Sequence, residues 1–168
     1  MTDGGKRFHF TARVSWVGGR EGMLQAPGLP TIAVSAPPEF RGRGDTWTPE
    51  HLCVSAAASC YMTTFAAVAE SSRLEFKSLT VDAEGKLEKT ASGYELTEIV
   101  LKPALTVRSV NDIDRAGRLL EKAKKHCIVS NAMRTPVRIE TRVYHEQTPA
   151  CPCPTIEPSS PEVELSGG

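Results

Sequence analysis

Hydrophobic and polar residues alternate strictly along residues 7–17, RFHFTARVSWV, and this pattern predicts a half-buried antiparallel strand. The apolar face of the predicted strand consists of Phe8, Phe10, Ala12, Val14 and Trp16. The glycines of GGREG, residues 18–22, predict a turn, because glycine tolerates backbone angles that other residues avoid. A second strand is expected at residues 31–36, TIAVSA, and a loop at residues 37–45.

The segment TPEHL predicts the start of a long helix. Thr48 is a good N-cap, Pro49 suits the first helical position, and Glu50 favours the positive end of the helix dipole. The helix is expected to run to about Ser71.

A second helix is expected after a cap at Asn111 or Asp112, because apolar residues then recur at intervals of three and four. They form one stripe, which consists of Ile113, Ala116, Leu120, Ala123 and Cys127. Cys127 is therefore expected at the end of a stripe that faces the core.

Strand patterns account for most of the remaining chain. Three strand candidates, at residues 74–85, 86–91 and 94–107, follow the first helix as a meander, and residues 137–145 alternate again as a last strand. This order of elements indicates the α+β class. We expect one domain over residues 1–146 and a disordered Pro- and Ser-rich tail over residues 147–168, which has little to bury.

Composition narrows the possible partners. The chain has 168 residues, enough for one domain without metal or disulfide crosslinks, and its 20 basic and 20 acidic residues balance. This balance argues against a nucleic-acid or anionic-membrane partner. The N-terminus lacks the apolar core of a signal peptide, and no apolar run is expected to span a membrane, so we expect a cytoplasmic protein.

The five cysteines are an odd number, and a reducing cytosol favours free thiols or transient, catalytic disulfides. Cys60, in AAASCYMTT, suits either a small apolar core position or a working thiol. Cys127 makes a reactive pair possible, if two packed helices bring both sulfurs together. Cys53 lies seven residues before Cys60, about 10 Å along a helix axis, too far for a disulfide.

A reactive thiol also needs a cation that holds the thiolate. Arg20, in the glycine-rich turn, and Glu50, at the start of the long helix, could supply a bidentate pair, although both also suit ordinary surface positions. A metal site is a further alternative, since imidazole and thiolate suit zinc, but the candidate ligands lack the usual spacing. These candidates are His51, Cys53, Cys60, His126 and Cys127.

Three motifs occur together: VGGREG, then TPEHLCVSAAASC with an acid ten residues before its last cysteine, and finally KKHCIVSNA. Over residues 8–144 the chain resembles the OsmC/Ohr family of organic hydroperoxide reductases. The resemblance implies an intertwined homodimer with antiparallel sheets and two main helices, whose two sites are built from both subunits. It also implies that Cys60 attacks the peroxide, that Cys127 resolves the sulfenic acid as a disulfide, and that Arg20 and Glu50 polarise the site.

The implied activity is that of a thiol-dependent peroxidase that needs no cofactor and reduces organic hydroperoxides to alcohols. An external dithiol, such as a lipoyl or thioredoxin-like protein, would then reduce the disulfide. Apolar residues near Cys60, namely Met62, Phe65 and Val68, would favour alkyl or lipid hydroperoxides, and they equally suit the core. The alternative is a non-catalytic OsmC-like protein that binds small molecules.

The sequence departs from the family pattern in two places. Many members carry proline directly after the second cysteine, where this chain has Ile128. The difference is expected to affect how easily the helix end rearranges when the disulfide forms. Cys151 and Cys153, in CPCP of the expected tail, have no counterpart in the motifs.

Overall fold

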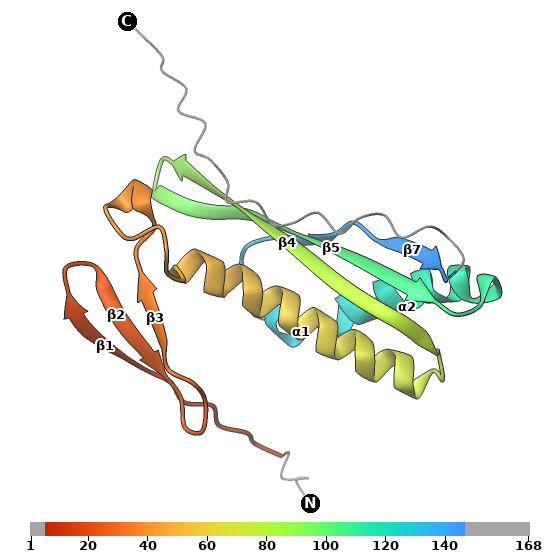
Figure 1. The fold of residues 1–168 in the computed structure, drawn as a ribbon. Coiled ribbons are helices and arrows are strands. Elements are labelled where there is room, and N and C mark those ends of the chain that lie inside the picture. Colours follow the sequence, from red (N-terminus) through yellow and green to blue (C-terminus); the bar gives the residue numbers. More distant parts are fainter. Residues whose placement is uncertain (1–5, 147–168) are drawn as a thin grey trace, which may run out of the picture.

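The computed structural model describes residues 6–146, so residues 1–5 and the expected tail at 147–168, with Cys151 and Cys153, lie outside the described residues. The described chain combines two sheets with two main helices, which confirms the α+β class (Figure 1). The elements are β1 (Arg13–Gly18), β2 (Glu21–Gln25), β3 (Ile32–Ser35), η1 (Pro38–Phe40), α1 (Pro49–Ser71), β4 (Phe76–Thr90), β5 (Gly93–Val107), η2 (Val110–Asp112), α2 (Ile113–His126), α3 (Ile128–Ala132), β6 (Val137–Ile139) and β7 (Arg142–His145).

The first sheet is antiparallel, with the strand order β1-β2-β3. Gly18, at the end of β1, and Gly19, in the turn that follows, have φ angles of 141° and 49°, which favour glycine. The expected turn was too long, because β2 begins at Glu21 and Gly22 lies buried inside that strand. A Cβ at Gly22 would lie only 3.2 Å from both the Ser15 carbonyl oxygen and Val14 Cγ1, so this glycine permits close packing of β1 against β2.

The apolar face predicted for residues 7–17 is exposed within the chain, which corrects the expectation of a half-buried strand. The strand itself begins only at Arg13. Phe8, Phe10 and Trp16 expose 75%, 93% and 76% of their surface. The physical reason is the position of this sheet, which extends from the start of α1 away from the β4–β5 layer (Figure 1), so that none of residues 6–146 forms a second layer over its apolar face.

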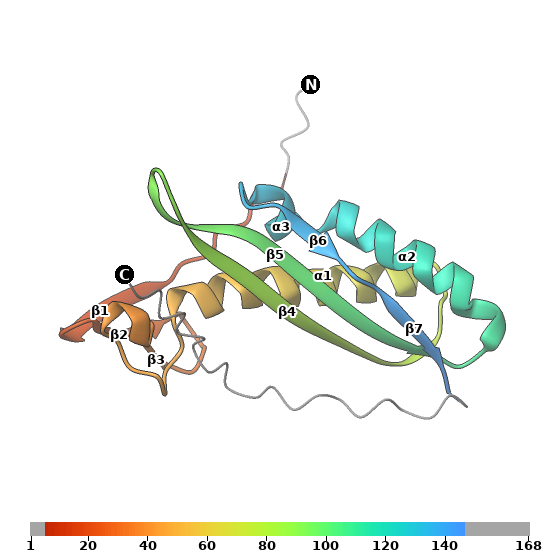
Figure 2. The ribbon, with the colours of Figure 1, turned by 90° about the horizontal axis from the view of Figure 1, so that it is seen from above.

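The second sheet is a long β4–β5 hairpin, paired antiparallel from Phe76↔Val107 to Thr90↔Gly93. Two of the three strand candidates, at residues 74–85 and 86–91, are therefore one continuous strand. The predicted last strand is divided into β6 and β7, which both pair in parallel with β5. Figure 2 shows β6 and β7 following one another along β5.

Both helices pack on the same face of this sheet (Figures 1 and 2). The predicted bounds of α1 are confirmed, and Thr48 Oγ1 accepts the His51 N–H at 3.2 Å as its N-cap. The predicted α2 stripe is likewise buried at Ala116, Leu120 and Ala123. These residues join side chains of α1 and β5 in one core that includes Tyr61, Phe65, Ile99, Leu101 and Leu105.

One expectation about membranes needs correction, because α1 is long and apolar enough to cross a membrane by length and composition. The core helix of a soluble protein meets the same criterion. Here Ala57, Tyr61, Phe65, Val68 and Ala69 of α1 are buried in the core with α2 and the second sheet. The described chain is therefore a soluble fold.

Candidate active site

Cys60 lies in the middle of α1, on the side that contacts α2 and α3. Its side chain is half-buried and its thiol is free. The Val129 amide N–H donates a hydrogen bond to Cys60 Sγ at 3.5 Å. This bond joins α1 to α3, and its two residues are 69 positions apart in the sequence. The residues around Cys60 therefore do not indicate that the fold places a backbone donor beside it.

Cys127 connects α2 to α3. It has an extended backbone, with φ −67° and ψ 107°, so it ends one helix and precedes the other. Its side chain is fully buried, which confirms that the α2 stripe ends in the core. The Ser130 hydroxyl donates a hydrogen bond to Cys127 Sγ at 3.1 Å. The second thiol is therefore held at a break between helices and contacted by a buried hydroxyl.

The environment of Cys60 favours its thiolate. Burial raises the pKa of this thiol, but hydrogen bonds outweigh burial and hold the pKa below its usual value. The donors are the Val129 amide, the Cys127 thiol, the Thr64 hydroxyl and the Ile128 amide, in decreasing order of effect. Cys127 is thus one of the groups that act on the Cys60 sulfur. A lowered pKa increases the fraction of Cys60 that is present as the nucleophilic thiolate at neutral pH.

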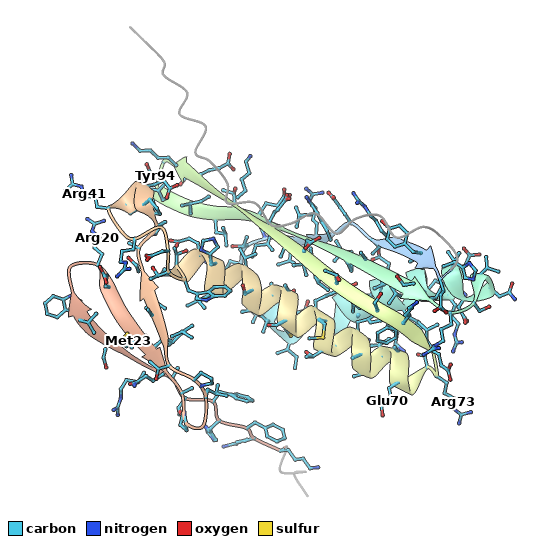
Figure 3. The ribbon with its side chains drawn as sticks, viewed as in Figure 1. Arg20, Met23, Arg41, Glu70, Arg73 and Tyr94 are labelled. Carbon is cyan, nitrogen blue, oxygen red and sulfur yellow. The ribbon has the colours of Figure 1, made fainter. Side chains whose placement is uncertain are left out.

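The other two predicted site residues lie elsewhere in the single chain. Arg20 is exposed in the turn between β1 and β2, where its guanidinium donates to the Phe40 carbonyl oxygen. Figure 3 shows Arg20 beside the first sheet, at the opposite end of α1 from Glu70. Glu50 lies in the first turn of α1, ten residues before Cys60, which is about 15 Å along the helix axis. One chain therefore brings together Cys60 and Cys127, and leaves Arg20 and Glu50 apart from them.

The N-terminal end of α1 contains polar atoms without partners. Within residues 6–146, Glu50 Oε2 and Thr46 Oγ1 are buried and have no hydrogen-bond partner. Buried polar atoms normally have partners, because an unsatisfied one costs about 1–3 kcal/mol. This end of α1 therefore has unused hydrogen-bonding capacity.

Two of the three apolar residues predicted near the thiol belong to the core. Phe65 is fully buried and packs edge-on against Phe76, with ring centroids 5.5 Å apart. Val68 is also buried, whereas Met62 is 40% exposed. Of this set, only Met62 has a surface that a substrate could reach in the single chain.

The proposed metal ligands are not gathered into a site. No group of three or more His, Cys, Asp or Glu side chains that could hold a metal ion occurs among residues 6–146. His51 instead lies 3.0 Å from Thr48 Oγ1 through Nδ1, at the start of α1.

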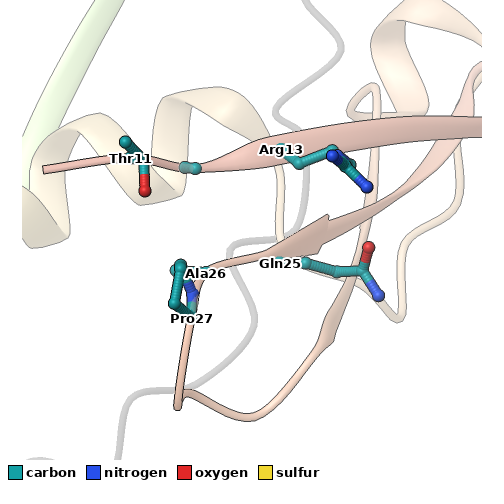
Figure 4. A pocket seen from close by; sticks show the side chains of 6 residues that line it. Thr11, Arg13, Gln25, Ala26 and Pro27 are labelled. Atoms are coloured by element: carbon teal, nitrogen blue, oxygen red, sulfur yellow. The ribbon is translucent and has the colours of Figure 1, made fainter.

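The two surface pockets described below lie away from the two thiols. One pocket of about 400 Å³ lies between β1 and β2, where Arg13 and Gln25 form part of its wall (Figure 4). Another, of about 310 Å³, lies at the start of α1 and is lined by Asp45, Trp47 and His51. Neither pocket is lined by Cys60 or Cys127. We therefore place the candidate site at the two thiols and not at either pocket.

Sequence reasoning missed the groups that contact the two sulfurs. Thr64 lies one turn after Cys60 in the predicted long helix, so helical spacing indicated that its hydroxyl was within reach. Ser130 lies three residues after Cys127, beyond the end of the predicted second helix, so helical spacing gave no such signal for its hydroxyl. The amides of Ile128 and Val129 gave no such signal, because α3 was not predicted.

The sequence matches a known protein family. Residues 42–142, more than half of the chain, match the family described as OsmC-like protein. The uncharacterized protein YmaD of Bacillus subtilis is 31% identical over 137 residues, which cover 79% of this chain and 91% of that protein.

Solved structures share the fold. An OsmC-like protein of unknown function from Vibrio cholerae has a TM-score of 0.74 at 23% identity, covering 81% of this chain and 100% of that one. An organic hydroperoxide resistance protein from Elizabethkingia anophelis has a TM-score of 0.68 at 24% identity, covering 84% and 99%. With the sequence match over residues 42–142, these findings show that the chain belongs to the OsmC-like protein family.

Proposed function

We propose that this protein is a thiol-dependent peroxidase that reduces organic hydroperoxides. The observation that carries the proposal is the half-buried Cys60 thiol, whose sulfur accepts the Val129 N–H at 3.5 Å and whose lowered pKa also reflects a contact from Cys127. Two adjacent thiols, one of them favoured as a thiolate, suit a peroxidatic and resolving pair. The organic hydroperoxide resistance protein with the same fold supports this choice of substrate class.

The reaction proceeds in two steps. The Cys60 thiolate attacks the terminal oxygen of the hydroperoxide, the O–O bond breaks, and the alkoxide leaves and takes up a proton to become an alcohol. Cys60 is then a sulfenic acid. Cys127 attacks its sulfur, the S–S bond forms, and the S–O bond breaks with release of water. An external dithiol, lipoyl or thioredoxin-like, returns both cysteines to thiols in the reducing cytoplasm.

The polar half of the site is proposed to come from a second copy of the chain. Glu50 lies about 15 Å from Cys60 along α1, and the Arg20 guanidinium donates to the Phe40 carbonyl oxygen and not to the thiol. Two features support a homodimer: the exposed apolar face of the first sheet, and the buried Glu50 Oε2, which has no hydrogen-bond partner in the described part of the chain. In such a dimer, Glu50 would orient Arg20, and Arg20 would stabilise charge at the partner's thiolate.

Mass spectrometry tests the thiol chemistry directly. One equivalent of tert-butyl hydroperoxide should produce a Cys60–Cys127 disulfide, seen as a single crosslinked peptide pair after digestion without reductant. Continuous peroxide consumption in the presence of dihydrolipoamide should then show turnover. Binding of the hydroperoxide without its consumption would instead favour a non-catalytic binding protein.

A further inference from the structure

Ser130 is a buried hydroxyl with an unusual acceptor. Its residue exposes 6% of its surface, and its hydroxyl donates to Cys127 Sγ at 3.1 Å. A neutral thiol sulfur is a weak acceptor, so this bond contributes little while Cys127 is protonated. A hydrogen bond to a thiolate is charge-assisted and roughly twice as strong. The hydrogen bond from Ser130 therefore stabilises the Cys127 sulfur most when Cys127 loses its proton.

The hydrogen bonds around the two sulfurs run in one direction. Ser130 donates to Cys127 Sγ, the Val129 N–H donates to Cys60 Sγ, and the Cys127 thiol helps to lower the pKa of Cys60. Every donor in this series leads toward Cys60, the more accessible of the two sulfurs. These contacts favour negative charge on Cys60, whose pKa lies below its usual value.

We propose that Ser130 is a positioning residue for the resolving step, in which its hydroxyl holds the Cys127 sulfur toward Cys60 and stabilises that sulfur as its proton leaves. The inference rests on the proposed peroxidase function and adds a residue to it. It concerns the second step, the attack of Cys127 on oxidised Cys60, and leaves the first step to the donors that contact Cys60 directly.

Atoms and protons balance in the second step, the attack of Cys127 on oxidised Cys60. After peroxide attack, Cys60 bears a hydroxyl group in place of its negative charge. The Cys127 sulfur attacks the Cys60 sulfur, and the S–O bond breaks as the S–S bond forms. The Cys127 proton passes to the departing oxygen, which leaves as water. Ser130 keeps its own proton throughout, because its hydroxyl only donates to the sulfur on which negative charge develops.

A purely structural role for Ser130 is the competing explanation, since a small buried residue next to a helix break also fills space. Ser130→Thr and Ser130→Val separate the two roles, because their side chains have nearly the same shape and only threonine keeps a hydroxyl. Asn131→Ala is the matched control within α3, because it removes a hydrogen bond from Asn131 Nδ2 to the Lys125 carbonyl oxygen and touches neither sulfur.

Stopped-flow mixing with tert-butyl hydroperoxide resolves the two steps. Dimedone trapping measures sulfenic acid formation, and acid quench with mass spectrometry measures disulfide formation. Ser130→Ala and Ser130→Val should slow disulfide formation about tenfold, the kinetic effect of one lost hydrogen bond of about 1.4 kcal/mol. Sulfenic acid formation should change much less. Ser130→Thr and Asn131→Ala should resolve close to the wild-type rate.

The pH profile adds a measurement that a space-filling role would not affect. The slower resolution in Ser130→Val should recover as the pH rises, because hydroxide in solution can then remove the Cys127 proton. Equal resolution rates in Ser130→Thr and Ser130→Val at every pH would overturn the inference. A wild-type protein that forms neither a sulfenic acid nor a disulfide would overturn the proposed function instead, so the two failures are distinguishable.

Discussion

The backbone amide of Val129 donates a hydrogen bond to Cys60 Sγ at 3.5 Å, so the start of α3, next to the second thiol, also holds the first. The Ile128 amide and the Cys127 thiol act on the same sulfur and help to lower its pKa. Residues 127–129 thus supply consecutive donors to one acceptor. Since Cys127 directly precedes α3, the second thiol and the amide donors to the first are held by one stretch of backbone.

The first prediction tests the Ile128 amide with Ile128→Pro. Proline is accepted here, because Ile128 is the first residue of α3 and the preceding Cys127 already has extended backbone angles. The substitution removes one N–H donor, so the pKa of Cys60 should rise. At a pH below that pKa the thiolate fraction falls, and alkylation by iodoacetamide should slow severalfold.

Ile128→Ala is the control for this experiment, because it shortens the exposed side chain and keeps the amide. Its rate of alkylation across pH should match that of the wild type. An Ile128→Pro variant that is alkylated as fast as Ile128→Ala throughout the pH range would show that the Ile128 amide does not stabilise the thiolate.

The second prediction assigns different roles to the two cysteines. Cys60→Ser should abolish even a single turnover, because a serine hydroxyl at its ordinary pKa is a poor nucleophile toward peroxide. Cys127→Ser should consume about one equivalent of hydroperoxide and then stop as a Cys60 sulfenic acid, which dimedone labels. Dimedone on Cys127 in the Cys60→Ser protein would reverse the two roles.

The third prediction tests whether the site is shared between two chains. Arg20→Ala and Cys60→Ser proteins should each be nearly inactive alone. If Arg20 acts on the partner's Cys60, a refolded equal mixture contains heterodimers with one intact site and regains about a quarter of wild-type activity. The readout is the rate of peroxide consumption after co-refolding.

The control carries Arg20→Ala and Cys60→Ser on the same chain and is mixed with an equal amount of wild-type chain. If the site is shared, its heterodimers are inactive and the mixture keeps about a quarter of wild-type activity, whereas sites within one chain would keep about half. A mixture of the two single variants that stays inactive, in a protein shown to be dimeric, would rule out a shared site. Arg41 or Arg43 of the neighbouring loop would then be the next candidates for the cation.

Local sequence signals were sufficient for the two main helices. Thr48 and Pro49 mark the start of α1, and the apolar stripe of α2 leads to Cys127, because caps and helical periodicity depend on neighbouring residues. They were not sufficient for β2, where the glycines and polar residues of GREG favour a turn. The pairing of β2 with both β1 and β3 outweighs that local preference.

The candidate site was predictable only in part. Cys60 and Cys127 were recognised from their motifs, and the structure brings them together. The amide donors of residues 128–129 depend on a short helix whose ends are fixed by tertiary packing. The separation of Glu50 from Cys60, in contrast, follows from the helical rise alone, so the sequence already excluded a direct contact within one chain.

The last prediction concerns the packing that positions α1, and it depends on Gly85. This residue interrupts the strand pattern of the sequence, yet it lies within the continuous strand β4. A Cβ placed there would come within 2.5 Å of Val54 Cγ2 on α1 and 3.1 Å of Leu96 Cδ1 on β5. Glycine is therefore required for the close approach of α1 to the sheet.

Gly85→Ala should lower the free energy of unfolding by about 2 kcal/mol, because the methyl group overpacks this contact and displaces the start of α1. Val54→Ala removes the closest atom, so the double variant should recover part of that loss, and urea denaturation of all four proteins measures the coupling between the two sites. Cys60 lies about 9 Å further along α1 than Val54, so its reaction with iodoacetamide should change little in the folded Gly85→Ala protein. If Gly85→Ala costs as much stability in the Val54→Ala background as in the wild-type background, the helix moves away freely, and this contact does not fix the position of α1.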